Sequence, residues 1–293
     1  MTVPIRIAVI GGSGLYNMPE ITERSSIMVD TPYGRPSDRL MVGMIHGKRV
    51  VFIPRHAEGH ILNPSEVPYR ANIWALKSLG VRFCIAVNAC GSLREEYAPG
   101  HLVIPDQLVD YTKSERGGRT FFEDGLVAHV SVADPFCNEL SNIVFGASRA
   151  IKDVKVHRGG TFVTIEGPRF STRGESRVYR QLGFDIIGMT TCPEAFLARE
   201  AEISYTTIAH ITDYDVWHMT EEVVTSDLVI QRVHDNVAAV QRIIAAAVER
   251  IDEDADFASH HALDGAFMTA PGKLSRKMID RLAPILRDRF SAP

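Results

Sequence analysis

The chain has 293 residues, of which 45% are hydrophobic and 23% charged, so it can form one large domain or two small ones with a substantial core. Its formal net charge of -4 argues against a broad basic face and against nucleic acid as the main partner. No apolar run is long enough to cross a bilayer, and the N-terminus lacks the sections of a signal peptide. We therefore expect a cytoplasmic protein with no membrane partner.

Apolar runs that end at small, polar or charged residues predict five strands. In chain order they are Ile7–Ile10, Val50–Ile53, Ile85–Val87, Ile186–Ile187 and Thr207–Ala209. Helical patterns alternate with them, at Pro68–Leu79, Ser171–Leu182, Pro193–Ala201 and Asp227–Ile251. This alternation predicts an α/β fold, in which loops at the strand ends converge on one pocket.

The last part of the chain has a different composition. An acidic segment at residues 252–256 precedes Leu274–Phe290, whose apolar residues recur at helical spacing. A unit of about 40 residues is too small to fold alone without disulfides, a bound metal or a partner. We predict one domain over residues 1–251, followed by a linker and helix over 252–293 that packs on the body or on a neighbouring subunit.

The polar, glycine-containing stretch Tyr111–Asp124 predicts a mobile loop.

Four cysteines are spread along the chain without a C-x-x-C pair. Such spacing fits a reducing compartment and argues against both a disulfide framework and a zinc site. We therefore expect no metal. The cysteines are Cys84, Cys90, Cys137 and Cys192.

A glycine-rich turn, Gly11–Gly14, follows the first strand. Glycines let several N–H groups point at one spot and bind an anion, and Ser13 adds a hydroxyl donor. The turn lacks the lysine of a P-loop, and Asn17 occupies the place of the third glycine in G-x-G-x-x-G. Leu15 excludes the G-x-S-x-G elbow of hydrolases. An ordinary structural turn explains the pattern equally well.

Arg55 and His56 directly follow the second strand. A planar guanidinium can hold two phosphate oxygens at once, although a lone arginine more often forms a surface salt bridge. The pair His56 and His60 superficially suggests a metal site. Gly59 argues against a helix there, and no glutamate follows the first histidine as a metalloprotease requires.

Asp213 and Asp215 follow the last strand on one short loop. Two carboxylates beside one ligand can take different roles when one of them carries a proton. One could then donate to a ring nitrogen while the other accepts from an exocyclic amine. A solvated turn is the alternative, but Tyr214 is large for a loop that faces only water. Phe170 offers a ring for stacking on a base, or is a core aromatic.

Eight motifs in this order resemble the trimeric class of the purine nucleoside phosphorylase superfamily, and within it the branch that acts on S-methyl-5′-thioadenosine. The resemblance covers about residues 5–245. The motifs are Gly11–Leu15, Thr31–Gly34, Arg55–His56, Ala71–Lys77, Ala89–Glu96, Thr164–Ser171, Met189–Thr191 and Thr212–Asp215.

The resemblance implies a phosphorylase-like fold, in which helices flank a mixed, barrel-like central sheet. It also implies a homotrimer with its active sites at subunit interfaces. The implied reaction is cleavage of the N-glycosidic bond of methylthioadenosine by inorganic phosphate, which gives adenine and 5-methylthioribose 1-phosphate. Phosphate is then a co-substrate and no cofactor is needed.

Carried over position by position, the resemblance implies a phosphate site, a ribose contact and a base site. The phosphate site consists of Ser13, Arg55, His56, Asn88, Ala89 and Thr190. The residues implied to bind the nucleoside are Met189 at the ribose, Phe170, Ser171, Asp213, Tyr214 and Asp215 at the adenine, and Ser226 and a neighbour's His129 at the 5′ substituent.

Three positions depart from the familiar pattern of the animal enzymes. Ser13 and Asn88 stand in place of threonines, and both keep a hydrogen-bond donor. Ser226 replaces an apolar valine near the methylthio group, so the 5′ pocket is less strictly apolar.

The reaction needs no protein nucleophile, because an anchored phosphate attacks a cation-like sugar and Asp213 protonates the leaving purine. The nearest alternative is a phosphorylase for 6-oxopurine nucleosides or methylthioinosine, against which the carboxylate pair argues. A nicotinamide-dependent dehydrogenase is a different class; here Arg55 stands where its acidic residue would be. A purine-sensing module would not need both a phosphate site and an acid.

Overall fold

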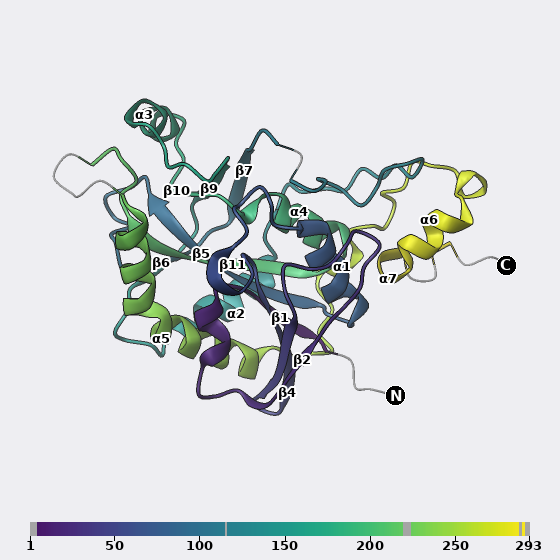
Figure 1. Cartoon of the computed structure of the whole chain (residues 1–293), viewed down its shortest axis with the longest axis horizontal. Helices are drawn as coiled ribbons and strands as arrows, with labels where there is room; N and C mark the ends of the chain where they lie inside the picture. The colour runs from purple at the N-terminus through teal and green to yellow at the C-terminus, as the bar shows by residue number, and fades with distance from the viewer. Residues whose placement is uncertain (1–4, 115, 219–223, 287–288, 291–293) are drawn as a thin grey trace.

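The computed structural model describes residues 5–114, 116–218, 224–286 and 289–290. They form a single domain around a mixed sheet of 11 strands, with helices on both faces (Figure 1). The predicted fold class, a mixed central sheet flanked by helices, is confirmed. The strands are β1 (Ile7–Gly11), β2 (Thr22–Ile27), β3 (Leu40–Ile45), β4 (Lys48–Pro54), β5 (Phe83–Ser92), β6 (Leu102–Ile104), β7 (Gln107–Tyr111), β8 (Val156–Arg158), β9 (Thr161–Ile165), β10 (Ile186–Gly188) and β11 (Ser204–Asp213).

Strand β5 is the branch point of the sheet. The main path runs β2-β3-β4-β1-β5-β10-β9-β7, and β11 pairs with β5 and leads on to β6 and β8. The first half of β5 pairs in parallel with β1 through residues 83–86, whereas β10 takes over as antiparallel neighbour only at Gly91 and Ser92. The β1–β5 pairing thus ends before β10 begins, so the sheet is open beside residues 87–90.

The helices cover the two faces of the sheet. Helices α2 and α5 pack against each other on one face, and α1 and α4 contact each other on the opposite face. In Figure 1, α3 projects at one end of the molecule and α6 lies at the other. The helices are α1 (Tyr69–Ser78), α2 (Asn138–Ser148), α3 (Arg173–Gln181), α4 (Thr191–Glu200), α5 (Ser226–Arg250), α6 (Arg276–Arg281) and α7 (Ala283–Leu286).

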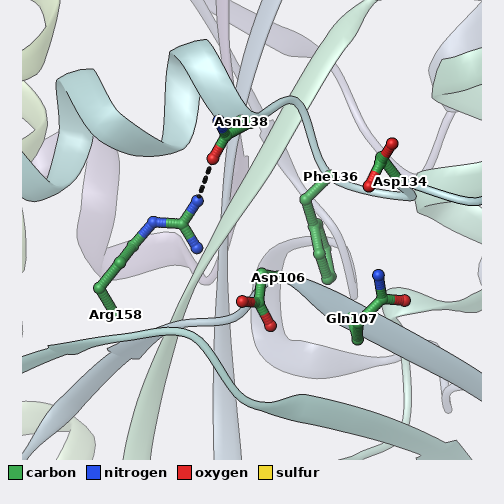
Figure 2. A pocket seen from close by; sticks show the side chains of 6 residues that line it. All are labelled: Asp106, Gln107, Asp134, Phe136, Asn138 and Arg158. Carbon is green, nitrogen blue, oxygen red and sulfur yellow. Dashed lines mark hydrogen bonds between the residues drawn. The ribbon is translucent and has the colours of Figure 1, made fainter.

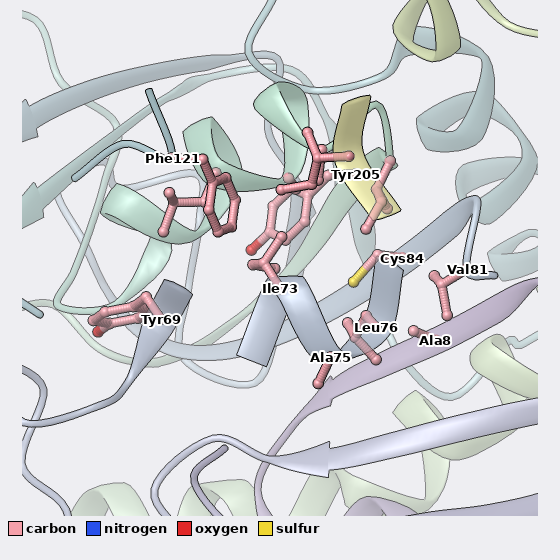
Figure 3. Close-up of a cluster of buried hydrophobic side chains, with 14 of the residues drawn as sticks. Ala8, Tyr69, Ile73, Ala75, Leu76, Val81, Cys84, Phe121 and Tyr205 are labelled. Atoms are coloured by element: carbon pink, nitrogen blue, oxygen red, sulfur yellow. The ribbon is translucent and has the colours of Figure 1, made fainter. Parts of the chain in front are cut away.

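Alternation along the central strands divides the core into two clusters. Ala8 of β1 and Cys84 of β5 face Ile73 and Leu76 of α1 (Figure 3). The intervening residues of the same strands belong to a second cluster, which includes α2 and α5. Because successive side chains of a strand point to opposite faces, a strand buried on both faces favours apolar residues at every position. Four of the five runs predicted from sequence are wholly apolar, the fifth begins with Thr207, and all five lie in strands.

The C-terminal prediction is partly wrong. The expected single helix over Leu274–Phe290 is two short helices, α6 and α7, separated at Leu282, whose φ is −102° and ψ 10°. Pro284 explains the break, since proline has no N–H to donate to the preceding turn and is tolerated only in the first turn of a helix, where it stands in α7. Leu282 and neighbouring apolar residues nevertheless join the cluster that contains α1. Residues 287–288 of the predicted helix lie outside the described residues.

Candidate active site

An opening faces the middle of β5. Val87 and Gly91 are half-buried and Ala89 is exposed, whereas the residues between them are buried. The neighbouring strand β11 is buried along its whole length. An exposed alanine in the centre of a sheet means that no side chain covers that face of β5. The candidate active site is this opening.

One end of the opening carries the predicted phosphate ligands. The N–H of Arg55 donates to the carbonyl of Gly11 at 2.9 Å, which joins the arginine to the glycine turn. The guanidinium forms a two-point ion pair with Glu194 of α4, at 2.7 Å for each contact, and also donates to Val87 O at 2.9 Å. A guanidinium has five N–H groups. Two therefore stay available to a ligand, as far as the described residues show.

Electrostatics keep Arg55 charged. Burial by itself lowers the pKa of the guanidinium, but the Glu194 carboxylate raises it well above its ordinary value. The arginine is only 3% exposed. The sequence did not single out Glu194, because its partner is 139 positions away along the chain. The paired carboxylate orients the guanidinium and cancels much of its charge.

His56 lies beside Arg55 with a defined tautomer. Its Nδ1 is 2.8 Å from the carbonyl of Leu62, so Nδ1 carries hydrogen and donates. Burial, together with the nearby Arg55 charge, lowers the pKa of His56 to about 4. The ring is therefore neutral near pH 7, and its Nε2 is an acceptor. The ring of His60 stacks on it with centroids 4.2 Å apart.

Asn88 and Thr190 meet in a buried chain of hydrogen bonds. Thr207 donates to Asn88 Oδ1 at 2.6 Å, and Asn88 Nδ2 donates to the hydroxyl of Thr190 at 2.7 Å. Because this hydroxyl oxygen already accepts a bond, its own hydrogen is free for an anion. The sequence did not single out Thr207 as a member of this chain of bonds, since a threonine inside a strand has an ordinary packing explanation.

Asp213 lies at the other end of the opening, next to a bulge. The register of β11 against β5 shifts between Ile211 and Asp213, which turns the end of the strand toward the opening. The carboxylate accepts from Thr212 Oγ1 and from the N–H of Asp215, both at 2.7 Å. Burial raises the pKa of Asp213 to about 6, so it can carry a proton close to neutral pH.

Asp215 has a buried oxygen, Oδ2, without a hydrogen-bond partner. Burial raises its pKa, while the nearby hydroxyls of Ser176 and Ser171 act in the opposite direction. Neither hydroxyl forms a hydrogen bond of normal geometry, so all three oxygens remain unpartnered in the described structure. The backbone of Asp215 has a φ of 50°, a strained value for a residue other than glycine. Sequence reasoning missed Ser176, since nothing in the sequence marks a buried helical serine.

The two ends lie along the same stretch of β5. Gly91 is opposite Asp213 in the β5–β11 register, and a Cβ on that glycine would lie 3.0 Å from the carboxylate. Asn88 lies three residues earlier on β5, which is roughly 10 Å along a strand. Between them, burial raises the pKa of the Cys90 thiol, Asp213 raises it further and Arg55 lowers it. Arg55 and Asp213 are thus both within electrostatic reach of Cys90.

The remaining predicted residues differ in how close they lie to this stretch of β5. Met189 is half-buried just before Thr190, and Phe170 is 37% exposed. Tyr214 donates to Glu95 O at 3.1 Å and stacks on His218. Three further predicted residues do not join the group through a described side chain. His129 and Ser226 are exposed, and the side chain of Ser13 lies outside what the structure describes.

A separate cavity of about 340 Å³ lies between the start of β7 and the N-terminus of α2 (Figure 2). In it, Arg158 donates to Asn138 Oδ1 at 2.8 Å. None of its lining residues is among those predicted for the site. We place the site at β5 instead, because the acids with raised pKa values and the anion donors gather there. The cavity is lined by Asp106, Gln107, Asp134, Phe136, Asn138 and Arg158.

No helix in the described part of the chain is both long and apolar enough to span a membrane. The four cysteines predicted to be unpaired are free and buried.

Comparison with known proteins identifies close relatives. The model of the phosphorylase superfamily matches residues 6–249. An S-methyl-5′-thioadenosine phosphorylase from Chloroflexus aurantiacus is 53% identical over 279 residues, which cover 95% of this chain and 96% of the relative. One from Geobacter sulfurreducens is 49% identical over 280 residues, covering 96% of this chain and 97% of the relative.

Solved structures agree with the sequence relatives. A methylthioadenosine phosphorylase from an Antarctic soil metagenomic library superposes with a TM-score of 0.92 at 49% identity, covering 97% of this chain and 99% of that one. Methylthioadenosine phosphorylase from Schistosoma mansoni, solved in complex with adenine, has a TM-score of 0.83 at 36% identity, covering 91% of this chain and 100% of that one.

Proposed function

The chain belongs to the phosphorylase superfamily, and from this premise we propose that it cleaves S-methyl-5′-thioadenosine with inorganic phosphate. The products are adenine and 5-methylthioribose 1-phosphate, and the enzyme is a pentosyltransferase. Relatives of nearly the same length carry this activity in their names. Phosphate is the co-substrate, and the proposal requires no other cofactor.

The observation that carries the proposal is the placement of opposite chemistries along β5. Anion donors lie around Asn88, and a buried carboxyl pair lies beside Gly91. The separation of roughly 10 Å suits a phosphate at one end, a purine at the other and a ribose between them. Ala89 leaves the space in front of the strand open.

Phosphate binds, in this proposal, at the turn of Gly11 to Gly14 and beside Arg55, His56, Asn88, Ala89 and Thr190. The free hydrogens of Arg55 and Thr190 donate to its oxygens. Nε2 of neutral His56 accepts a hydrogen bond from a protonated phosphate oxygen, because Nδ1 already donates to Leu62. The anchored phosphate stabilises the cation-like ribose and attacks its anomeric carbon.

Asp213 acts as the general acid toward N7 of the leaving purine. Breaking the glycosidic bond leaves negative charge on the purine, which a protonated Asp213 neutralises by donating its proton. Its raised pKa of about 6 keeps this proton accessible near neutral pH. The phosphate oxygen forms the new bond to the sugar as the bond to nitrogen breaks, so no covalent enzyme intermediate arises.

Asp215 selects the base. Its unpartnered Oδ2 accepts from the 6-amino group of adenine. A 6-oxopurine would place an acceptor against this acceptor, and such a mismatch can discriminate by about 10⁴-fold. Phosphorolysis of 6-oxopurine nucleosides or methylthioinosine is therefore the less favoured candidate. Phe170 and Tyr214 border the base, and Ser171 lies close to Asp215.

Subunit assembly completes the proposed site. Met189 contacts the ribose, while Ser226, together with His129 from a neighbouring subunit, borders the 5′ substituent. His129 is exposed, which is compatible with its contributing to the active site of a neighbouring subunit. We propose a homotrimer in the cytoplasm, with residues 252–293 as a C-terminal appendage to a catalytic domain of residues 1–251.

A product assay tests the function. The protein is incubated with methylthioadenosine, adenosine or inosine, with and without phosphate, and the released base is measured by chromatography. We expect adenine from methylthioadenosine only when phosphate is present. Release of hypoxanthine alone, or release that does not depend on phosphate, would overturn the proposal.

A further inference from the structure

Arg116 is a buried cation that none of the predicted site residues explains. It belongs to the stretch Tyr111–Asp124, which the sequence predicted to be a mobile polar loop. The stretch is irregular beyond β7, but Arg116 is 2% exposed and its side chain points into the protein. Burying a guanidinium is costly unless its donors find acceptors. This arginine therefore has a specific structural role.

The guanidinium of Arg116 binds the segment that carries Thr190. Its Nη1 donates to Met189 O at 2.6 Å and to Cys192 O at 3.1 Å. These two carbonyls flank Thr190, whose hydroxyl bonds to Asn88. The segment is irregular: Cys192 has non-helical φ and ψ values of −100° and 136° inside α4. An irregular turn of this kind needs external partners to keep its peptide groups oriented.

The same side chain holds the end of β9. Its Nη2 donates to Ile165 O and to Glu166 Oε1, both at 3.2 Å. Glu166 in turn accepts from Ser65 and from the backbone N–H groups of Lys113 and Ser114. Burial raises the pKa of Glu166, but these hydrogen bonds outweigh it and lower the pKa to about 2. Arg116 and Glu166 thus join the loops that precede Phe170, follow His56 and lead to Thr190.

The peptide between Met189 and Thr190 links this network to the anion site. In a trans peptide the C=O and the following N–H point in opposite directions. Because the Met189 carbonyl points at Arg116, the N–H of Thr190 points away from it. We infer that Arg116 is a positioning residue, which holds both carbonyls so that the amide and hydroxyl of Thr190 stay directed at phosphate. This inference rests on the proposed function.

Arg119 provides a matched control. It is a second arginine of the same loop, and it bonds to Thr112 Oγ1 and Ser114 O of that loop and to Asp110 Oδ2 of the adjoining β7. None of these bonds reaches the segment of Met189 to Cys192. A general loosening of the loop should therefore follow from Arg119→Met and Arg116→Met alike, whereas misplacement of Thr190 should follow only from Arg116→Met.

The test compares the wild type with Arg116→Met and Arg119→Met. The KM for phosphate is measured at saturating methylthioadenosine, and the KM for methylthioadenosine at saturating phosphate. We expect Arg116→Met to raise the phosphate KM roughly 10- to 100-fold, because small misplacements of a binding group have effects of this size. Its KM for methylthioadenosine and both constants of Arg119→Met should change less than about threefold.

Each outcome discriminates. If the wild type releases no adenine, the proposed function fails and the inference with it. If the wild type is active but Arg116→Met and Arg119→Met raise the phosphate KM equally, or Arg116→Met weakens both substrates equally, only the inference fails. Should Arg116→Met not fold, Arg116→Lys decides, since lysine keeps the charge but its single nitrogen ends short of the Nη1 position that bonds both carbonyls, and it has no second nitrogen for Ile165 O. A raised phosphate KM supports positioning, and an unchanged one overturns it.

Discussion

The phosphate end and the base end of the opening are both buried, yet they differ in how far the protein satisfies its own polar groups. At the phosphate end, Arg55 is paired with Glu194, and Asn88 is held between Thr207 and Thr190. At the base end, Asp215 Oδ2 and the hydroxyls of Ser171 and Ser176 have no partners in the described structure.

This difference indicates two strategies of binding. An oxyanion accepts bonds from many directions, so a rigid, preformed set of donors suits it. A purine presents a specific pattern of donors and acceptors, and unpaired buried groups reject any base that fails to match it. Disruption of the phosphate end should therefore affect folding as well as binding, whereas disruption of the base end should affect rate and selectivity.

The largest effect is expected at the base end, from Asp213→Asn. Asparagine fills the same space but cannot deliver the acidic proton. We expect kcat to fall about 10²- to 10⁴-fold, the usual contribution of a general acid. Phosphate binding, measured by isothermal calorimetry with inorganic phosphate, should change little. Near-normal turnover in this variant would contradict the assignment of Asp213.

The pH profile sharpens this prediction. Burial raises the pKa of Asp213 to about 6, so its protonated form is present below that pH and is lost as the pH rises through it. Since kcat/KM reports groups of the free enzyme, the wild-type value should fall as the pH rises above about 6. The kcat/KM of Asp213→Asn should not show this fall. A fall that persists in the variant would belong to the titration of another group.

Next in size is the effect of Arg55→Met on folding. Removing the cation leaves the fully buried Glu194 without its charged partner, although the hydroxyl of Tyr205 still donates to it. Breaking a buried pair on one side typically costs about 3–5 kcal/mol, so the free energy of unfolding in urea should drop by that order. The double variant Arg55→Met/Glu194→Gln should be more stable than the sum of the single effects predicts. Strict additivity would show that the pair does not interact.

A smaller effect on phosphate alone is expected from Thr207→Val. The substitution removes the donor that fixes Asn88 Oδ1, so the amide can turn away from Thr190. We expect the phosphate KM to rise about tenfold, the equivalent of one lost hydrogen bond. The adjacent Thr206→Val is the control, because Thr206 bonds instead to Ser141 at 2.7 Å. Equal effects of both variants would show that only the strand is perturbed.

The smallest effect is expected from Ser176→Ala, and it should concern selectivity. The hydroxyl of Ser176 lowers the pKa of Asp215, which burial raises, so its loss should raise that pKa further. Ionised Asp215 accepts from the amine. As the pH is lowered, kcat/KM of the variant for methylthioadenosine should therefore begin to fall at a higher pH than that of the wild type. Preference over methylthioinosine should fall about three- to tenfold. Ser148→Ala, which removes a hydroxyl bonded within α2, should change neither property.

Much of the central fold could be predicted from the chain itself. Each of the five expected strands is present, because burial on both faces favours the largely apolar runs that mark them. The exposed β2 escaped prediction because few of its residues are apolar, and β6 and β8 escaped it because each has only three residues. The predicted C-terminal helix was too long, because the helical spacing of its apolar residues was followed and the break that Pro284 indicates was not.

The chemical groups at the strand ends followed from sequence alone, because a residue's chemistry and its place after an apolar run are both local properties. Glu194, Thr207, Ser176 and Arg116 emerged only from the folded chain. Each acts through a partner distant in sequence, such as Arg55 at 139 positions or Met189 at 73. Burial also decides the charge of each group, so the neutral ring of His56 and the acidic proton of Asp213 are properties of tertiary structure.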